Sequence, residues 1–150
     1  MVCGAHDTHS SYGPNRFRRA AANTGQIPIF GGGEERRDHI DVTDVAAVVR
    51  MVLQRRSEGT LNVATGCSPT FREVAELVAK QFPNDIAIVQ QPRQPGVAIT
   101  HRHFDVSALH AAFPHFRPLT PAEAIARAHR ESGIAARPVV SGDVGTTGRK

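Results

Sequence analysis

Two short segments combine arginine with glycine or proline, a combination suited to binding phosphate groups. They are residues 12–17 (YGPNRF) and residues 30–38 (FGGGEERRD). A helix that begins after Pro14 would offer free N–H donors to an anion. The planar guanidinium of Arg37, at the mouth of a strand, could donate two parallel hydrogen bonds to a phosphate. The alternative is a capped helix followed by a solvated arginine pair, and the residue types leave both interpretations open.

The glycine run 31–33 does not match a nucleotide-binding loop. It is neither GxxxxGK[ST] nor GxGxxG between a strand and a helix, so we expect a tight turn. The sequence also contains no nucleophile elbow and no HExxH motif. Tyr12, the single tyrosine, is followed four residues later by Arg16 rather than by lysine. We therefore predict no catalytic residue and no cofactor-binding residue in this chain.

Eight histidines raise the question of a metal site. His101 and His103 would share one face of a strand, and His6 and His9 are three residues apart. No third and fourth ligand accompanies either pair, and structural zinc needs a closed set, so no metal site is predicted. Cys3 and Cys67 are far apart in the sequence, and buried or inert thiols are expected.

Composition limits the class of protein. The chain has 150 residues, 18 Lys and Arg against 14 Asp and Glu, and two cysteines. Half of its net charge of +4 falls in residues 134–150, so the nearly neutral remainder argues against a nucleic-acid partner. A weak alternative is an RNA or DNA binder that uses Arg16, Arg18, Arg19, Arg36 and Arg37. No apolar run approaches a membrane span, and no signal peptide is visible, so a cytoplasmic protein without membrane contact is expected.

The elements that must position these residues alternate between short strands and helices, which predicts an α/β fold. Strands are expected at residues 27–30, with Pro28 indicating an edge, and at residues 38–42, 61–63, 86–89 and 99–104. Helices are expected at about residues 16–23, from Thr43 to Gly59, from Thr70 to Pro83, from Asp105 to Phe113 and from Thr120 to about Gly133. Thr70 with Glu73, and Thr120 with Glu123, are predicted capping boxes. The second helix carries one predicted apolar stripe, made of Val45, Val48, Val49, Val52 and Leu53.

Four segments in order, GAHD, YGPNRF, IPIFGGGEERRDHIDVTDVA and TLNVATGCSPTFREVAELV, resemble the extended short-chain dehydrogenase/reductase family. The chain is similar to the carboxy-terminal half of an NAD-dependent epimerase/dehydratase, over about residues 2–130. That family combines a Rossmann domain with a small carboxy-terminal lobe and binds a nucleotide sugar between them. The resemblance implies the carboxy-terminal part of this fold, with a substrate-binding lobe over residues 1–133. Residues 134–150 show no periodicity and many small polar residues, so a disordered tail is expected there.

The resemblance also implies substrate-binding residues. Asn15 matches a loop asparagine that contacts the nucleotide, and Phe30 belongs to the segment that lines the base pocket. Arg37 matches an arginine that clamps the diphosphate, and Arg93 lies in a segment that reaches the nucleotide from the far side. Val97 stands where the family often has an acidic residue for the ribose, which departs from the pattern.

The family's glycine-rich loop and Tyr-x-x-x-Lys pair have no match in these 150 residues. The resemblance therefore implies NAD or NADP for the complete enzyme, not bound by this chain alone, and a Rossmann half supplied in cis or in trans. Gly4 and Ala5 match the loop that passes the nicotinamide. Strands of a parallel sheet normally have covered faces, so we expect an exposed apolar flank on the helix that carries Val45, Val48 and Val52, or on the strand beside that helix.

The expected function is the nucleotide-sugar-binding portion of an NAD-dependent epimerase, dehydratase or reductase, truncated and without turnover alone. The alternative is a non-catalytic module that docks on another Rossmann protein. A homodimer is left open.

Overall fold

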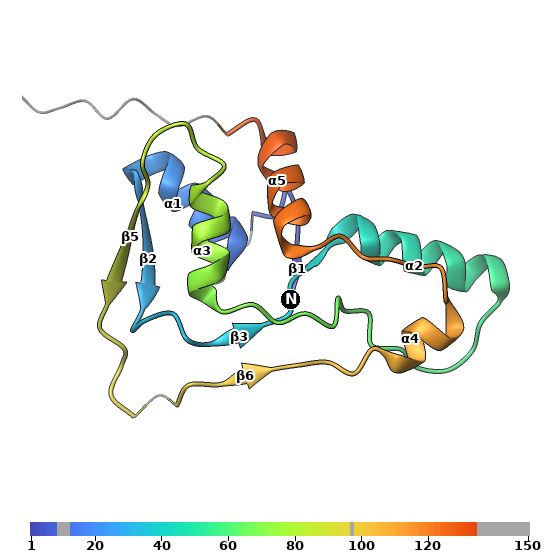
Figure 1. Ribbon diagram of the computed structural model, residues 1–150. Coiled ribbons are helices and arrows are strands. Elements are labelled where there is room, and N and C mark those ends of the chain that lie inside the picture. Colours follow the sequence, from blue (N-terminus) through green and yellow to red (C-terminus); the bar gives the residue numbers. More distant parts are fainter. Residues whose placement is uncertain (9–12, 97, 135–150) are drawn as a thin grey trace, which may run out of the picture.

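The computed structural model describes residues 1–8, 13–96 and 98–134 and has the expected α/β class (Figure 1). The predicted tail lies outside the described residues except for Ile134, as do Tyr12 and Val97. The strands are β1 (Val2–Cys3), β2 (Gln26–Phe30), β3 (Arg36–Arg37), β4 (Ile40–Asp41), β5 (Ala87–Gln91) and β6 (His101–Arg102). The helices are α1 (Pro14–Thr24), α2 (Val42–Arg55), α3 (Phe71–Ala79), α4 (Ser107–Ala112) and α5 (Pro121–Ser132).

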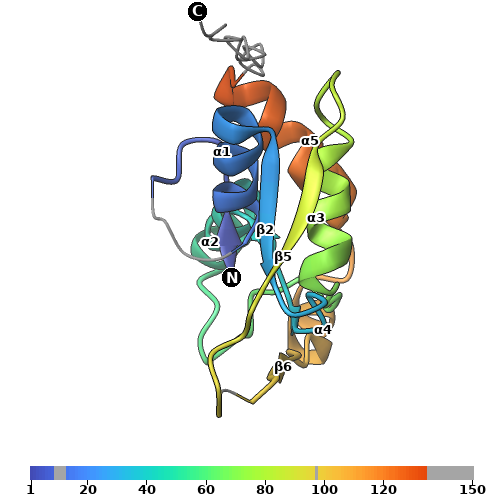
Figure 2. The same ribbon diagram turned by 90° about the vertical axis from the view of Figure 1, so that its left-hand side faces the viewer.

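The longest pairing joins β2 and β5 in parallel, with Ile27 opposite Ile88 and Pro28 opposite Val89. Within the described residues each strand has one neighbour, which places Pro28 on an edge strand as expected. Ile27 and Ile29 are fully buried, whereas Phe30 is half-buried. Figures 1 and 2 show α1 and α3 on the same side of this pair, which is the side that the two isoleucines face.

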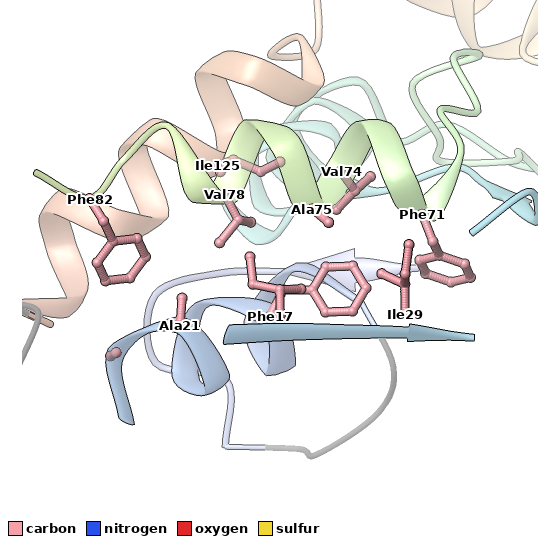
Figure 3. Close-up of a cluster of buried hydrophobic side chains, with 11 residues drawn as sticks. Phe17, Ala21, Ile29, Phe71, Val74, Ala75, Val78, Phe82 and Ile125 are labelled. Atoms are coloured by element: carbon pink, nitrogen blue, oxygen red, sulfur yellow. The ribbon is translucent and has the colours of Figure 1, made fainter. Parts of the chain in front are cut away.

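The main core lies between α1, β2 and α3, and α5 closes it (Figure 3). Phe17 of α1 and Phe71 of α3 meet edge to face, with ring centroids 6.1 Å apart. Ile29 of β2 and Val78 of α3 fill the space beside these rings, and Ile125 extends the cluster to α5. These side chains fix β2 and α3 relative to each other, and thereby the turn that follows β2.

A second apolar cluster joins α2 to α4. Val48, Leu109 and Phe113 are each 1 % exposed, and Phe116 completes the buried set. The cluster lies away from the β2–β5 pair, at the other end of the molecule in Figure 1.

The predicted stripe on α2 divides between two faces. Val48 is buried and Val45 and Val52 are half-buried, so these three do not form the expected exposed flank. The exposed apolar surface is instead formed by Val42, Val49 and Leu53, which are 49 %, 50 % and 71 % exposed, and it continues onto Val2 of β1, 53 % exposed. We call these four residues the apolar face. The expectation of uncovered apolar surface on this helix or on the strand beside it is confirmed, although Val45, Val48 and Val52 themselves do not form that surface.

The expected strand at residues 38–42 is wrong in extent, because β4 ends at Asp41 and α2 begins at Val42. Asp41, not Thr43, caps the helix: its carboxylate accepts the Thr43 N–H at 2.8 Å and the Thr43 hydroxyl at 2.6 Å. At the other end α2 stops at Arg55, and Arg56 adopts a left-handed conformation, so Gly59 does not end the helix. The acidic side chain provided a stronger cap than the threonine two residues later.

Residues 61–63 were expected as a strand and form none. Leu61 and Val63 pack on the second cluster, and the Asn62 amide donates to the Asp105 carbonyl at 3.0 Å. Side-chain packing and this amide contact hold the segment without a strand neighbour. Asp105 accepts the Ser107 N–H, and α4 begins at Ser107, two residues later than expected.

Both predicted capping boxes are confirmed, at Thr70 and at Thr120. α3 is shorter than expected and ends at Ala79, but Phe82 still reaches the core from the following turn. In the described part of the chain, no helix has the length and apolar character that a membrane crossing requires.

Candidate functional site

The turn at residues 31–33 directly follows β2 and uses its own N–H groups. Gly31 donates to the Gln91 carbonyl at 2.9 Å, and Gly33 donates to the Phe30 carbonyl at 3.1 Å. The Gly32 N–H donates to the Glu34 carboxylate at 3.0 Å. The three donors are therefore satisfied by protein acceptors, one of them on β5, and the chain continues into β3 rather than into a helix. The predicted tight turn is confirmed, and this run does not fit the phosphate groups of a dinucleotide.

Arg93 follows β5 and reaches across to the end of β2. Its guanidinium donates to the Phe30 carbonyl at 3.3 Å and to the Glu34 carboxylate at 3.0 Å. A second nitrogen of the group lies 3.4 Å from the Glu35 carboxylate. Phe30, Glu35, Arg93 and Gln94 line a hollow of about 260 Å³, which we call the Arg93 hollow. It lies at the carboxyl ends of two parallel strands, the edge where α/β sheets bind ligands.

Arg37 occupies the next strand and is held firmly in place. Its guanidinium donates to the Thr100 carbonyl at 2.5 Å and to the Thr100 hydroxyl at 2.7 Å. The group also lies 5.9 Å from the centre of the Phe71 ring. Glu35 approaches Arg37 at 4.0 Å, so one carboxylate lies between the guanidiniums of Arg37 and Arg93.

The cluster is electrically balanced, with two guanidiniums facing two carboxylates. The N–H groups of Glu34 itself and of Gly32 hold the pKa of the Glu34 carboxyl below its usual value, and Arg93 adds to this effect. Glu34 therefore remains ionised and competes with any other anion for Arg93. Because half of the Glu34 side chain is exposed, at 52 %, solvent weakens this ion pair.

Of the four residues expected to bind substrate, the structure brings together Phe30, Arg37 and Arg93. Asn15 belongs to a different set of contacts, in the first turn of α1, where its amide donates to the Asp7 carboxylate at 2.5 Å. Asn15 is only 5 % exposed, and its described contacts do not reach the Arg93 hollow. Its proposed contact with a nucleotide stays a prediction.

The sequence reasoning missed the carboxylates and the hydroxyl that engage these arginines. Glu34 and Glu35 directly follow the glycine run. Their position beside this run was the only feature of the sequence that could have indicated a contact with Arg93. Thr100 is 63 residues from Arg37 and carried no signal.

The two cysteines differ. Cys3 is buried, and burial raises the pKa of its thiol to about 12, which makes it an inert group as expected. Cys67 is exposed. Across residues 1–8, 13–96 and 98–134, no three His, Cys, Asp or Glu side chains gather closely enough to hold a metal ion.

Comparison with known proteins shows that this chain has a known fold. Residues 1–64 match the model of the NAD dependent epimerase/dehydratase family. UDP-N-acetylglucosamine 4-epimerase from Methanobrevibacter ruminantium M1, solved with UDP-N-acetylmuramic acid, is 28 % identical, with a TM-score of 0.72 over 86 % of this chain and 42 % of that one.

Two further structures show the same fold. Epimerase Mth375 from Methanothermobacter thermautotrophicus is 23 % identical, with a TM-score of 0.74 over 86 % of this chain and 40 % of that chain. UDP-glucose 4-epimerase from Thermus thermophilus, solved with NAD, is 24 % identical, with a TM-score of 0.70 over 89 % and 45 %. This chain thus spans less than half the length of these structures, and the resemblance read from its sequence is confirmed.

Proposed function

We propose that this chain binds a nucleotide sugar as part of a cytoplasmic enzyme. The premise is its resemblance to part of the extended short-chain dehydrogenases/reductases of the NAD-dependent epimerase/dehydratase family. The observation that carries the proposal is the Arg93 hollow at the carboxyl ends of β2 and β5. The reaction class is epimerisation, dehydration or reduction through NAD or NADP.

Two residues of the hollow, Phe30 and Arg93, and the neighbouring Arg37 each supply one element of nucleotide recognition. Phe30 lines the hollow at the end of β2, where a base would lie against its side chain. Arg93 binds the diphosphate by exchanging Glu34 for a phosphate oxygen, since guanidinium groups form paired hydrogen bonds with phosphate. Arg37 is already oriented by Thr100 and adds positive charge beside this position.

The nicotinamide cofactor supplies hydride transfer, and a second domain would have to hold it. The described residues contain no helix that opens directly after a glycine-rich turn, and the N–H groups of residues 31–33 are already used. We infer that this domain covers the apolar face of α2 and β1, in cis or in trans. A hollow of about 630 Å³ at this face, lined by Val2, Gly4 and Val42 among others, gives room for the contact.

A second candidate function is a non-catalytic module that docks on another Rossmann protein through the same face. The observation favouring it is that Arg37 and Arg93 already have partners, namely Thr100, Glu34 and Glu35. A module of this kind would keep the docking surface and lose affinity for nucleotides.

The test is a panel of UDP-, dTDP- and GDP-sugars, scored by thermal stabilisation of the chain and by titration calorimetry. Binding by the parent protein that is lost in Arg93→Gln and in Arg37→Ala supports the substrate-binding function. Arg130→Gln, an exposed substitution on α5 that removes the same charge, is the control. Equal affinity in the parent and in Arg93→Gln would remove the hollow from the site. Absence of binding throughout would favour the docking module.

A further inference from the structure

A shallow groove between α2 and the segment after α4 is bordered by cationic side chains. Its volume is about 240 Å³. Its lining residues are Ala47, Arg50, Met51, Arg55, Phe113, His115, Phe116 and Arg117, and we call it the basic groove. Figure 1 shows α2 and α4 on the side of the molecule opposite to β2 and β5, so this groove is separate from the Arg93 hollow.

The floor of the basic groove is formed by buried apolar side chains. Phe113 and Phe116 belong to the second buried cluster and are 1 % and 9 % exposed. The Arg55 guanidinium lies over the Phe113 ring, 5.1 Å from its centre, and donates to the Ala112 carbonyl at 2.8 Å. Arg117 donates to the carbonyls of Pro114 and Phe116, at 2.7 and 2.8 Å. Two of the three guanidiniums are therefore oriented in advance.

None of the residues that line the basic groove is acidic. The ion pairs of the described residues do not involve Arg50, Arg55 or Arg117, and these three side chains are exposed. Arg55 and Arg117 use neutral carbonyl acceptors, which leaves further N–H donors on each group. Three larger hollows differ in this respect, because each includes a carboxylate: Glu131, Glu73 or Glu35.

We propose that the basic groove is a second ligand site, which binds the phosphate group of a small phosphorylated metabolite. Three guanidiniums around one hollow match a dianion with several equivalent acceptor oxygens, and arginine binds phosphate through paired hydrogen bonds. The volume is below the roughly 300–1,000 Å³ typical of sites for drug-sized ligands, so the groove fits a single phosphate with a small organic group. That group would lie against Met51 and the edge of Phe116.

The proposal does not depend on the proposed nucleotide-sugar site, because it uses other residues at the opposite end of the molecule. Arg50 is the most informative position to change. It is exposed and makes no described contact, so its substitution removes charge from the groove without removing a packing or capping interaction.

The experiment titrates the full chain, labelled with ¹⁵N, with inorganic phosphate and with glycerol 3-phosphate at constant ionic strength. Saturable shifts of the amides of residues 50–55 and 112–117 are expected. Arg50→Gln should weaken binding of both probes by about tenfold, as the loss of one charged hydrogen bond predicts. Arg130→Gln should leave their affinity unchanged.

Three results would overturn the proposal. The first is that amide shifts are confined to the residues around Arg93. The second is that Arg50→Gln and Arg130→Gln lose the same affinity for the phosphate probes. The third is that a polyglutamate peptide binds in the groove while neither phosphate probe binds. A second variant, Arg117→Lys, keeps the positive charge but removes the paired N–H donors of the guanidinium. It should weaken binding several-fold, and unchanged affinity would argue against paired hydrogen bonds to phosphate.

Discussion

The Arg93 guanidinium lies 3.0 Å from the Glu34 carboxylate, at the hollow where we propose that a nucleotide diphosphate binds. Glu34 directly follows the turn after β2, and Arg93 comes from the segment after β5, so this pair joins the ends of the two parallel strands. The contact both positions the arginine and occupies it. Under the proposed function, substrate binding at this hollow is therefore an exchange of one anion for another.

This exchange predicts that Glu34→Gln raises affinity for a nucleotide diphosphate. The substitution removes the charge that competes for Arg93 and keeps a neutral acceptor for the Gly32 N–H. Because Glu34 is half exposed, we expect a gain of a few-fold rather than of orders of magnitude. Calorimetry with UDP measures the effect. Glu76→Gln, an exposed substitution on α3, is the matched control, and equal gains in both variants would indicate a general charge effect.

A second prediction concerns pH and rests on His39. The ring is 3 % exposed, it packs 5.9 Å from the Phe71 ring, and neither nitrogen has a hydrogen-bond partner of normal geometry among the described residues. Burial, followed by the nearby positive amino terminus, lowers the pKa of His39 to about 4 from its usual 6.5. Above pH 6.5 the ring is neutral in both folded and unfolded chains. Below it the unfolded chain gains the proton first, so the free energy of unfolding falls between pH 6.5 and pH 4.

The difference in pKa corresponds to a loss of about 3 kcal/mol by pH 4. Urea unfolding of the parent and of His39→Phe at pH 7.5 and at pH 4.5 measures it. His39→Phe should lose much less stability on acidification, while His129, whose pKa burial also lowers, contributes to both proteins. A substitution at the exposed His103 should leave the pH dependence as it is. The same acid loss in His39→Phe would show that other groups are responsible.

A third prediction tests the apolar face. Leu53 is 71 % exposed, so Leu53→Glu should change the free energy of unfolding of this chain by less than about 0.5 kcal/mol. Val48 lies on the same helix and is 1 % exposed, so Val48→Glu should unfold the chain. Thermal unfolding compares the two variants.

If a cofactor-binding domain covers this face, Leu53→Glu should also abolish association with that domain, as measured by analytical ultracentrifugation. Retained association with the domain would show that it docks elsewhere. A change from dimer to monomer in this chain alone would show that the face joins two copies instead.

Sequence patterns predicted the parts of this structure that depend on neighbouring residues. Both capping boxes require only a threonine and a glutamate three residues apart, and both are present. The contacts of the site depend on residues 59 and 63 positions apart, such as Glu34 with Arg93 and Arg37 with Thr100. The resemblance to a family placed Phe30, Arg37 and Arg93 in one site, but it could not show which protein groups already bind these arginines.

A side-chain pattern also cannot decide which face of a helix is covered. Val42 and Val48 are equally apolar, and only the tertiary structure shows that one is exposed and the other buried. His39 illustrates the same limit, because a polar residue type gave no sign that its ring would pack against Phe71 in the interior.

The fourth prediction concerns Gly33, which ends the turn after β2. Its φ of +77° favours glycine, and a Cβ atom added there would lie 2.9 Å from the backbone nitrogen of Arg72 and 3.2 Å from the Ile29 side chain. Gly33→Ala should therefore lower the free energy of unfolding by about 1–3 kcal/mol and weaken nucleotide binding, since the turn positions Glu34 and Phe30. At Gly32 an added Cβ would approach only the end of the exposed Glu34 side chain, at 2.7 Å, which can move aside. Urea unfolding should show a much smaller loss for Gly32→Ala, and equal losses in the two variants would mean that the turn is not constrained by its contact with α3.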